Sequence, residues 1–481
     1  MELTYSVHVH KVEVRKNSAG KVVSYRVGWL VERLPLWRET FKTAAQADSF
    51  RSELIAATRR GEPFDVATGR PVSDSRKAVS PPWFAFAQDY VGSKWPYVSP
   101  NHRRGIADTM ADATEVMLSS KVVALSTAEL RAAVRWAVSE KVRDPARKVP
   151  PNLAPAIGWL ERNTVPMSAF EERGQGAQLA RQLLDRLSRK QDGSLAAASM
   201  AMRKRAIANN LMSYAIETGV LSANPLKAVK WTKPKVSEEI DVRVVANPDQ
   251  AARLLSAVAT HGELGERLVA FFGCMYYAAL RPEEVIGLQR NDLVSLPKKG
   301  WGEMLLHTAE TSPGKSWTDS GSQSERRGLK HRATGAVRPV PIHPYLVVLL
   351  RSHLERFPTA TGDVFRGPRG GRISDSSYLP HFHTARAEAF TPAEAASPLA
   401  DRPYALRHAA VSTWLNAGVD PTQVAEWAGH SVAVLLRVYA KCISGKDTEA
   451  KRRILDAMKP EPESEPNAER AEDETIPPGN E

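Results

Sequence analysis

The sequence predicts a multidomain α+β protein. Its expected parts are a small β-rich N-terminal module, an all-α domain and a mainly α domain that contains a small β-sheet. Three observations predict this class. Residues 1–60 alternate apolar and polar side chains, as strands do. Residues 81–231 repeat apolar side chains at helical spacing, and after residue 243 helical segments are interrupted by short strand-like runs. A chain of 481 residues is long enough for several domains with separate cores.

The N-terminal module is predicted over residues 1–60. Its strands are expected near residues 7–14, 22–31 and 37–41, with a hairpin turn at residues 17–20, and a helix is expected to begin near Thr43. Such a core is too small for an enzyme, so the module is either an accessory binding module or a structural appendage. Residues 61–80 are rich in Pro, Gly and Ser and are predicted to be a linker.

The second domain, residues 81–231, is predicted to be entirely helical. We expect helices at 101–118, 126–141, 176–190 and 195–219, each ending near Gly, Pro or Asn. A run of basic side chains on these helices is either a solvated face or a phosphate-contacting face, and the basic charge of the chain favours the second. The candidate DNA-binding residues are Arg103, Arg104, Arg203, Lys204 and Arg205.

A linker at residues 232–243 precedes the third domain, residues 244–459. A helix is expected at 249–260, followed by an apolar helix that includes residues 268–280. Strands are expected at 302–308 and 337–342, and further helices reach residue 458. Residues 460–481 are rich in Pro and Glu without periodicity and are expected to be a disordered acidic tail.

The charge of the chain predicts a polyanionic partner. The net charge is +12 and the isoelectric point is near 9.6; residues 461–481 carry −7, which leaves +19 on the rest. Nucleic acid is the leading candidate for the partner of so basic a chain. Two cysteines exclude a disulfide framework and a Cys-rich zinc site, as expected in a reducing cytoplasm. We expect no signal peptide, and the longest apolar run is too short to cross a membrane.

Three short segments in the last 200 residues stand out as candidates for chemistry. Arg281 lies in ALRPEEVIGL, where Pro282 is placed to begin a new helix after the apolar one. Arg407 lies in YALRHAAVSTWLNAG, three residues after Tyr404. The segment AGHSVAVLLRVYA places His430 nine residues before the tyrosine at position 439. Each residue alone is ordinary, and the order and spacing of all of them carry the prediction.

Together these motifs resemble those of the tyrosine recombinase (phage integrase) family, most closely the site-specific integrases of actinobacterial phages and integrative elements. The resemblance is strongest over about 244–445. It implies that residues 244–459 are the catalytic domain, that 81–231 are a helical core-binding domain, and that 1–60 are similar to an arm-type DNA-binding module. The implied activity is site-specific DNA recombination, in which double-stranded DNA is cleaved and rejoined to integrate or excise a mobile element.

The resemblance also implies the roles of the site residues. Tyr439 would attack the scissile phosphate and form a 3′-phosphotyrosyl bond, because it matches the family's nucleophile. Arg281 and Arg407 would clamp the phosphate with planar guanidinium groups. His430 would donate a hydrogen bond to a non-bridging oxygen, and Glu284 would orient the arginines. No metal, ATP or other cofactor is implied.

Two roles remain open in the sequence. Lys330 is favoured as the lysine that protonates the leaving 5′-oxygen, because it precedes the strand at 337–342, and Lys315 is the competitor. Tyr404 stands where the family most often has His, so the group that takes the proton of Tyr439 is unassigned. His408 is close in sequence, and its expected role is that of a buried packing histidine.

Two alternatives to a recombinase also fit the motifs. One is a type IB topoisomerase, and the other is a sequence-specific DNA-binding protein with impaired catalysis. The expected partners of a recombinase are double-stranded DNA attachment sites, further copies of the chain in a tetramer, and an excisionase or host DNA-bending protein. The segment 445–458, with Ile454, Leu455 and Met458 along one face, packs either on its own domain or on a neighbouring protomer.

Overall fold

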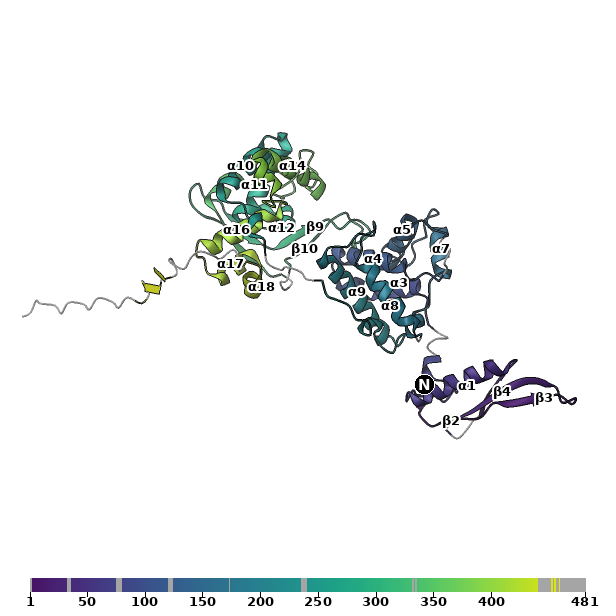
Figure 1. The fold of residues 1–481 in the computed structure, drawn as a ribbon. Coiled ribbons are helices and arrows are strands. Elements are labelled where there is room, and N and C mark those ends of the chain that lie inside the picture. Colours follow the sequence, from purple (N-terminus) through teal and green to yellow (C-terminus); the bar gives the residue numbers. More distant parts are fainter. Residues whose placement is uncertain are drawn as a thin grey trace, which may run out of the picture. The chain divides into compact units, whose positions relative to one another are not determined.

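The structure, a computed structural model, describes residues 2–32, 36–74, 80–119, 124–172, 174–234, 240–330, 333, 335–439, 451, 452, 454, 455 and 458. These form two compact units of mixed helix and sheet (Figure 1). The first contains Met1–Val236 and Ser312–Glu325, and the second contains Ser237–Thr311 and Arg326–Glu481. In the described parts of the chain, no helix is both long and apolar enough to cross a membrane.

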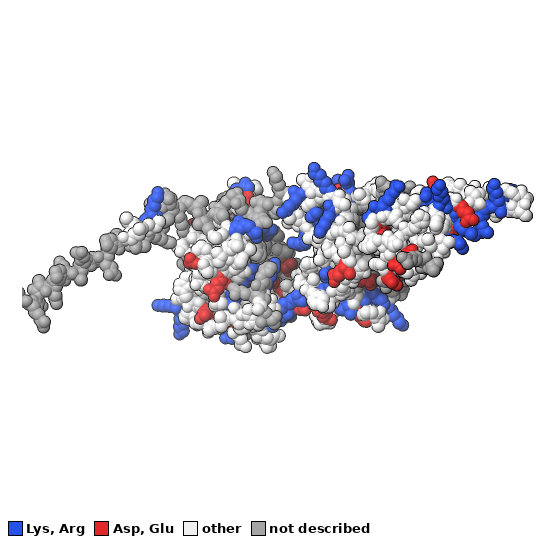
Figure 2. Space-filling model, turned by 90° about the horizontal axis from the view of Figure 1, so that it is seen from below, with Lys and Arg blue, Asp and Glu red and all other residues white. Residues whose placement is uncertain are grey.

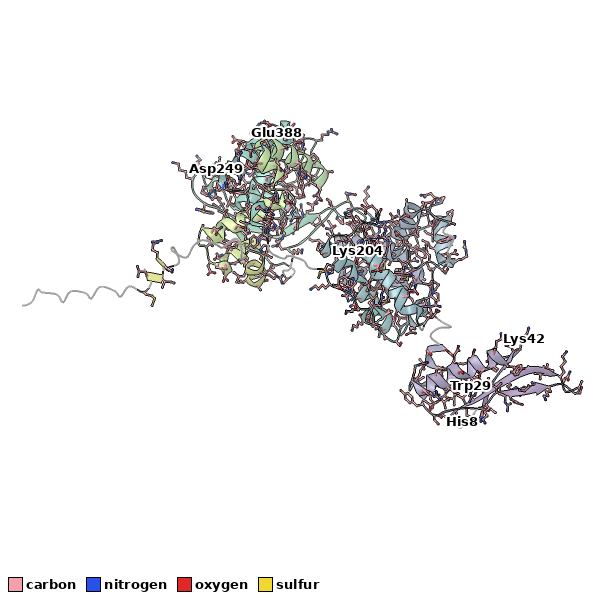
Figure 3. All side chains as sticks on the ribbon, viewed as in Figure 1. His8, Trp29, Lys42, Lys204, Asp249 and Glu388 are labelled. Carbon is pink, nitrogen blue, oxygen red and sulfur yellow. The ribbon has the colours of Figure 1, made fainter. Side chains whose placement is uncertain are left out.

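The N-terminal module is a β-sheet covered by one helix. Strand β4 (Val22–Val31) pairs with β2 (Val7–Val9), β3 (Glu13–Lys16) and β5 (Leu36–Phe41), all antiparallel. Alternate residues of β4 point inward, so Val27, Trp29 and Val31 pack beneath helix α1 (Ala44–Arg59). Figure 3 marks Trp29 and, on β2, His8.

Part of the predicted linker 61–80 is folded into this module, so that expectation was wrong for its first half. Strand β6 (Phe64–Asp65) pairs with β1 (Leu3–Thr4), and Phe64 is fully buried. The Trp29 indole N–H donates to the carbonyl of Gly69, which holds the turn between Asp65 and Gly69 against the sheet. The Pro and Gly residues of this stretch therefore make tight turns across a core rather than a free connection.

In the all-α part of the first unit, between residues 80 and 234, the described residues form helices joined by loops, with isolated β-bridges but no strand. Its core is a single apolar cluster that includes Trp83, Met110 and Leu211. Its α-helices are α3 (Trp83–Lys94), α4 (Pro100–Thr114), α5 (Thr127–Ala137), α6 (Glu140–Arg143), α7 (Ala154–Arg162), α8 (Gln175–Leu187) and α9 (Ala198–Glu217).

The segment Ser312–Glu325 belongs to this first unit, although the chain on either side of it belongs to the second. Trp317 is buried in the helical core, and Asp319 accepts a hydrogen bond of 2.8 Å from the indole of Trp95. Arg143 donates to the carbonyl of Lys315 at 2.6 Å. This segment is therefore a docked part of the helical domain.

The second unit surrounds a small antiparallel sheet of β7 (Leu293–Ser295), β8 (Gly302–Leu306) and β11 (Arg338–Ile342), with β8 in the middle. A separate pair joins β9 (Thr308–Thr311) and β10 (Glu325–Gly328). The main core lies around α10 (Pro248–Ala259), α11 (Gly262–Tyr277), α13 (Pro344–Arg356) and α14 (Asp375–Ala389). The remaining α-helices are α12 (Pro282–Ile286), α15 (Pro392–Ala396), α16 (Tyr404–Asn416), α17 (Pro421–Ala428) and α18 (Val432–Tyr439).

A second, smaller core joins α16, α17 and α18 and contains Tyr439 together with Val411, Val424 and Leu435. The predicted acidic tail, residues 460–481, lies outside the described residues, as do residues 440–450 of the segment before it. Ile454, Leu455 and Met458 are described, and their side chains are exposed.

Candidate active site

Arg281 is placed by the turn that joins α11 to α12. The turn passes through Ala279, which is buried at φ 51°, a conformation that L-residues rarely adopt. Arg281 is the N-cap of α12, where Pro282 occupies the first turn, and Glu284 accepts a 2.8 Å hydrogen bond from its backbone N–H. This capping arrangement holds the arginine in one direction. Its guanidinium also donates to the carbonyl of Gly429 at 2.8 Å.

Glu284 is a buried carboxylate shared by three arginines. It accepts hydrogen bonds from Arg281 at 2.7 Å and from both terminal nitrogens of Arg338 at 2.7 and 2.8 Å. Arg407 Nη1 lies 4.0 Å from Glu284 Oε2. Burial alone would raise the pKa of Glu284, but Arg338, Arg281 and Arg407 together lower that pKa to about 2. One negative charge among three positive ones leaves a site suited to an anion.

Arg407 is completely buried on α16. Its guanidinium donates to the carbonyls of Ala279 and Ala428 and contacts His430 Nε2 at 2.8 Å. Burial and the neighbouring Arg281 lower the pKa of Arg407. The backbone of the α11–α12 turn and the end of α17 therefore hold this arginine in place.

Gly429 must be glycine for two reasons. It ends α17 in the left-handed conformation at φ 66°, and a Cβ added there would lie 2.3 Å from Arg338 Nη1. The next residue, His430, is thereby turned toward Arg407. Burial and the nearby Arg407 lower the pKa of His430 to about 3, so its imidazole is neutral near pH 7.

Tyr439 is the last residue of α18, and its side chain is fully buried. Its hydroxyl lies 2.9 Å from His408 Nδ1, and its ring centre is 6.1 Å from that of His430. The structure thus brings Arg281, Arg407, His430 and Tyr439 into one unit, where hydrogen bonds and ring contacts connect their helices.

His408 differs from the sequence expectation of a packing histidine. It is half-buried, but its Nδ1 is hydrogen-bonded to the hydroxyl of the candidate nucleophile rather than surrounded only by apolar atoms. Because residues four apart share a helix face, His408 lies beside Tyr404, with ring centres 5.0 Å apart. Tyr404 in turn lies against Arg407, whose guanidinium carbon is 5.9 Å from the ring centre.

Lys330 and Lys315 lie in different parts of the structure. Lys330 is exposed and belongs to the same unit as the arginines, two residues after β10, and the preceding Leu329 is buried in the main core. Lys315 belongs to the segment docked on the helical domain. This placement supports Lys330 over Lys315, and the catalytic role of Lys330 stays a prediction.

Arg338 is the residue that the sequence analysis missed. It starts β11, is 1% exposed and binds Glu284 with both terminal nitrogens. Its only sequence signal is an arginine at the start of an otherwise apolar strand, and arginine is almost never fully buried without a partner. Within the described residues, no three His, Cys, Asp or Glu side chains are grouped as metal ligands would be.

The five candidate basic residues of the helical domain differ in exposure and in partners. Arg104 and Arg203 are exposed and line a cavity of about 720 Å³. Lys204, labelled in Figure 3, lines the same cavity but pairs with Asp112 at 2.5 Å. Arg205 lies over the ring of Trp231. Figure 2 shows basic side chains over much of the visible surface, interspersed with acidic ones.

Arg103 does not fit the expectation of a DNA contact. Its side chain is 2% exposed and donates to the carbonyls of Trp95 and Trp317 and to both carboxylate oxygens of Asp319, at 2.9 and 3.1 Å. A buried guanidinium with these partners holds the segment Ser312–Glu325 in place. Its neighbour Arg104 has the exposure that a phosphate contact requires.

Replacing Arg103 with alanine is expected to release this segment. The change removes the donors to Asp319 and to the Trp317 carbonyl, at a cost of about 2 kcal/mol, because the Asp319 side chain is 60% exposed. Limited proteolysis within Ser312–Glu325 should become at least roughly tenfold faster. Arg104→Ala, on the exposed side of the same helix, is the control and should leave the cleavage rate unchanged. Equal cleavage of both variants would contradict this role of Arg103.

The low pKa values of three histidines predict a loss of stability in mild acid. Burial lowers the pKa of His408 and His353 to about 4 and that of His430 to about 3, from an unfolded value near 6.5. The folded state favours the neutral forms. The stability that these histidines contribute is therefore complete above pH 6.5 and falls as the pH drops towards 4. Each histidine can contribute up to about 1.4 kcal/mol per pH unit.

Thermal melts at pH 7.5, 6 and 5 check this expectation. The melting temperature should already fall between pH 6.5 and 5, before the carboxylates titrate. A melting temperature that stays constant down to pH 5 would contradict the assigned environments of these three histidines.

No model of a known protein family matches the chain, and no curated protein does so either. Solved structures do match. The Tn1549 transposon integrase in complex with a circular intermediate DNA is 16% identical, with a TM-score of 0.45 over 66% of this chain and 98% of that one. The XerH site-specific recombinase bound to difH substrate is 14% identical, with a TM-score of 0.46 over 79% and 98%.

The DNA-bound lambda integrase is 12% identical, with a TM-score of 0.34 over 60% of this chain and 89% of that one. Because these identities do not exceed 16% and these TM-scores do not exceed 0.46, the function proposed below rests on the motifs and the site geometry. By their descriptions, these three structures are two integrases and a site-specific recombinase.

Proposed function

We propose that this chain is a tyrosine recombinase of the integrase type, which cleaves and rejoins double-stranded DNA at specific sites through a 3′-phosphotyrosyl intermediate. The observation that carries the proposal is the contact chain from the candidate nucleophile to the arginines. Tyr439 Oη lies 2.9 Å from His408, His430 Nε2 lies 2.8 Å from Arg407, and Arg281 reaches the backbone next to His430.

The site has the charge that phosphodiester transfer needs. Attack on phosphorus places extra negative charge on the non-bridging oxygens, which fixed cations stabilise. Arg281 and Arg407 supply that charge, and Arg338 keeps Glu284 ionised so that the carboxylate orients the arginines. Among the described residues, Arg407 Nε and His430 Nδ1 are buried without a hydrogen-bond partner. Buried donors without a partner at a cationic centre fit the oxygens of a phosphate group as acceptors.

The reaction needs no external energy source. Tyr439 Oη attacks phosphorus, the P–O5′ bond breaks, and the departing oxygen takes a proton from Lys330. The 5′-hydroxyl of the same or another strand then attacks the phosphotyrosyl bond and restores a phosphodiester. Exchange between two duplexes requires several protomers, so we infer a tetramer on two attachment sites, with an excisionase or a DNA-bending protein controlling direction. The exposed residues Arg104 and Arg203 are the proposed DNA-backbone contacts of the helical domain.

Strand exchange between labelled duplexes tests this function. The duplexes should carry the two ends of the genetic element in which the gene lies, and the products should be separated on a denaturing gel. A covalent protein–DNA adduct together with exchanged strands is expected. An adduct with relaxation of supercoiled DNA but no exchange would identify a type IB topoisomerase. Site-specific binding without an adduct would identify a DNA-binding protein and overturn the proposal.

A further inference from the structure

His408 and Tyr439 come from different helices and meet at their polar ends. His408 is the fifth residue of α16 and Tyr439 is the last of α18, and both helices contribute to the smaller core of the second unit. The His408 Nδ1 to Tyr439 Oη distance is 2.9 Å, and the ring centres are 5.8 Å apart at an interplanar angle of 58°. With the ring proton on Nε2, Nδ1 accepts a hydrogen bond from the tyrosine hydroxyl.

We propose that His408 takes the proton of Tyr439 during DNA cleavage, a role that rests on the proposed recombinase function. As the Oη–P bond forms and the P–O5′ bond breaks, the Oη proton passes to His408 Nδ1 and the imidazole becomes a cation. Lys330 gives its proton to O5′ and becomes neutral. Rejoining reverses both transfers: His408 returns the proton to Oη as tyrosine leaves. Every atom in the step comes from the chain and the DNA.

The other candidates for this role are occupied or unsuitable. Tyr404 is a phenol like the nucleophile itself, and its ring lies against Arg407 and His408. His430 directs Nε2 to Arg407 at 2.8 Å, so the lone pair on that atom is already used. His408 is thus the described histidine whose ring nitrogen lies within hydrogen-bond distance of the attacking oxygen.

The surroundings of His408 keep a lone pair available at neutral pH. Burial, then Arg402 and Arg407, lower the pKa of His408 to about 4, so the imidazole is neutral and can accept a proton. The charged or titratable groups around it are Tyr404, Arg402 and Arg407 on the side of α16, His430 after α17 and Tyr439 on α18. A phosphate bound by the arginines adds negative charge nearby and increases the basicity of the imidazole as the reaction begins.

The substitution His408→Asn separates proton transfer from positioning. The asparagine side-chain oxygen takes the place of Nδ1 and still accepts a hydrogen bond, but it cannot take the proton. We expect adduct formation at saturating DNA to slow by about 10² to 10⁴-fold, with DNA affinity changed by less than about threefold. Cleavage and rejoining should slow together. His383→Asn, an exposed histidine on α14 whose ring contacts Phe382, is the matched control and should react at the wild-type rate.

A second variant, His408→Ala, keeps the test decisive if the asparagine variant does not fold. Added imidazole should restore adduct formation in proportion to its concentration, which a purely structural histidine would not allow. Wild-type rates with an unchanged pH profile in His408→Asn, or no response of His408→Ala to imidazole, would overturn the assignment. An adduct missing even from the wild-type chain would overturn the recombinase function itself, and this role of His408 with it.

Discussion

Replacing Tyr439 with phenylalanine is expected to abolish the covalent protein–DNA adduct while leaving site-specific DNA binding in place. The variant keeps the buried ring and removes only the oxygen that attacks phosphorus, so the rate of adduct formation should fall at least about a thousandfold. DNA affinity should stay within about threefold, because phosphate contacts come mainly from basic side chains. Losing the hydrogen bond to His408 should cost about 1 kcal/mol of stability.

Tyr404→Phe is the matched control for this result. It also removes one phenolic oxygen, at a half-buried tyrosine whose ring lies against Arg407 and His408. That variant should still form the adduct. An adduct that persists in Tyr439→Phe and disappears in Tyr404→Phe would move the nucleophile to Tyr404.

Replacing Glu284 with glutamine is expected to destabilise the second unit strongly. The variant keeps the size of the side chain but removes the one carboxylate that binds Arg281 and Arg338 and lies near Arg407. Breaking a buried ion pair of this kind costs about 3–5 kcal/mol, which corresponds to a fall of roughly 10 °C in melting temperature. Adduct formation should fall strongly with it, since Arg281 loses its carboxylate partner and Arg407 loses the nearby counter-charge.

Glu266→Gln provides the comparison for Glu284→Gln. Glu266 pairs with Arg356 at 2.7 Å, but both side chains are more than a third exposed. An exposed pair of this kind contributes about 1 kcal/mol at most. Chemical denaturation of both variants gives the two free energies of unfolding. If Glu284→Gln is as stable as Glu266→Gln, the three-arginine cluster does not depend on that carboxylate.

Much of the candidate site could be predicted from the sequence because its residues lie in short, ordered motifs. Pro282 after an apolar helix predicted where Arg281 would sit, and the structure places it at a helix N-cap. The segment that carries His430 was identified from its spacing to Tyr439, and the structure places His430 directly after a left-handed C-cap at Gly429. Such features depend on neighbours within a few residues, which sequence patterns describe well.

The features that the sequence did not predict depend on contacts between residues far apart in the chain. Arg338 is 54 residues from Glu284, and His408 is 31 residues from Tyr439. Arg103 was assigned to DNA because it lies in a basic run, yet its partner Asp319 is 216 residues away. Helical periodicity predicts which side of a helix is buried, but it does not say which later segment packs there. The docking of Ser312–Glu325 on the helical domain was not predicted for the same reason.

The most direct test of the central claim is to map the residue that carries DNA in a trapped adduct of the wild-type chain. After nuclease treatment and tryptic digestion, mass spectrometry would locate the nucleotide on a peptide. We predict that it is found on the peptide 438–441, where Tyr439 is the only tyrosine. A nucleotide on a peptide that contains Tyr404, or on any residue other than Tyr439, would contradict the account.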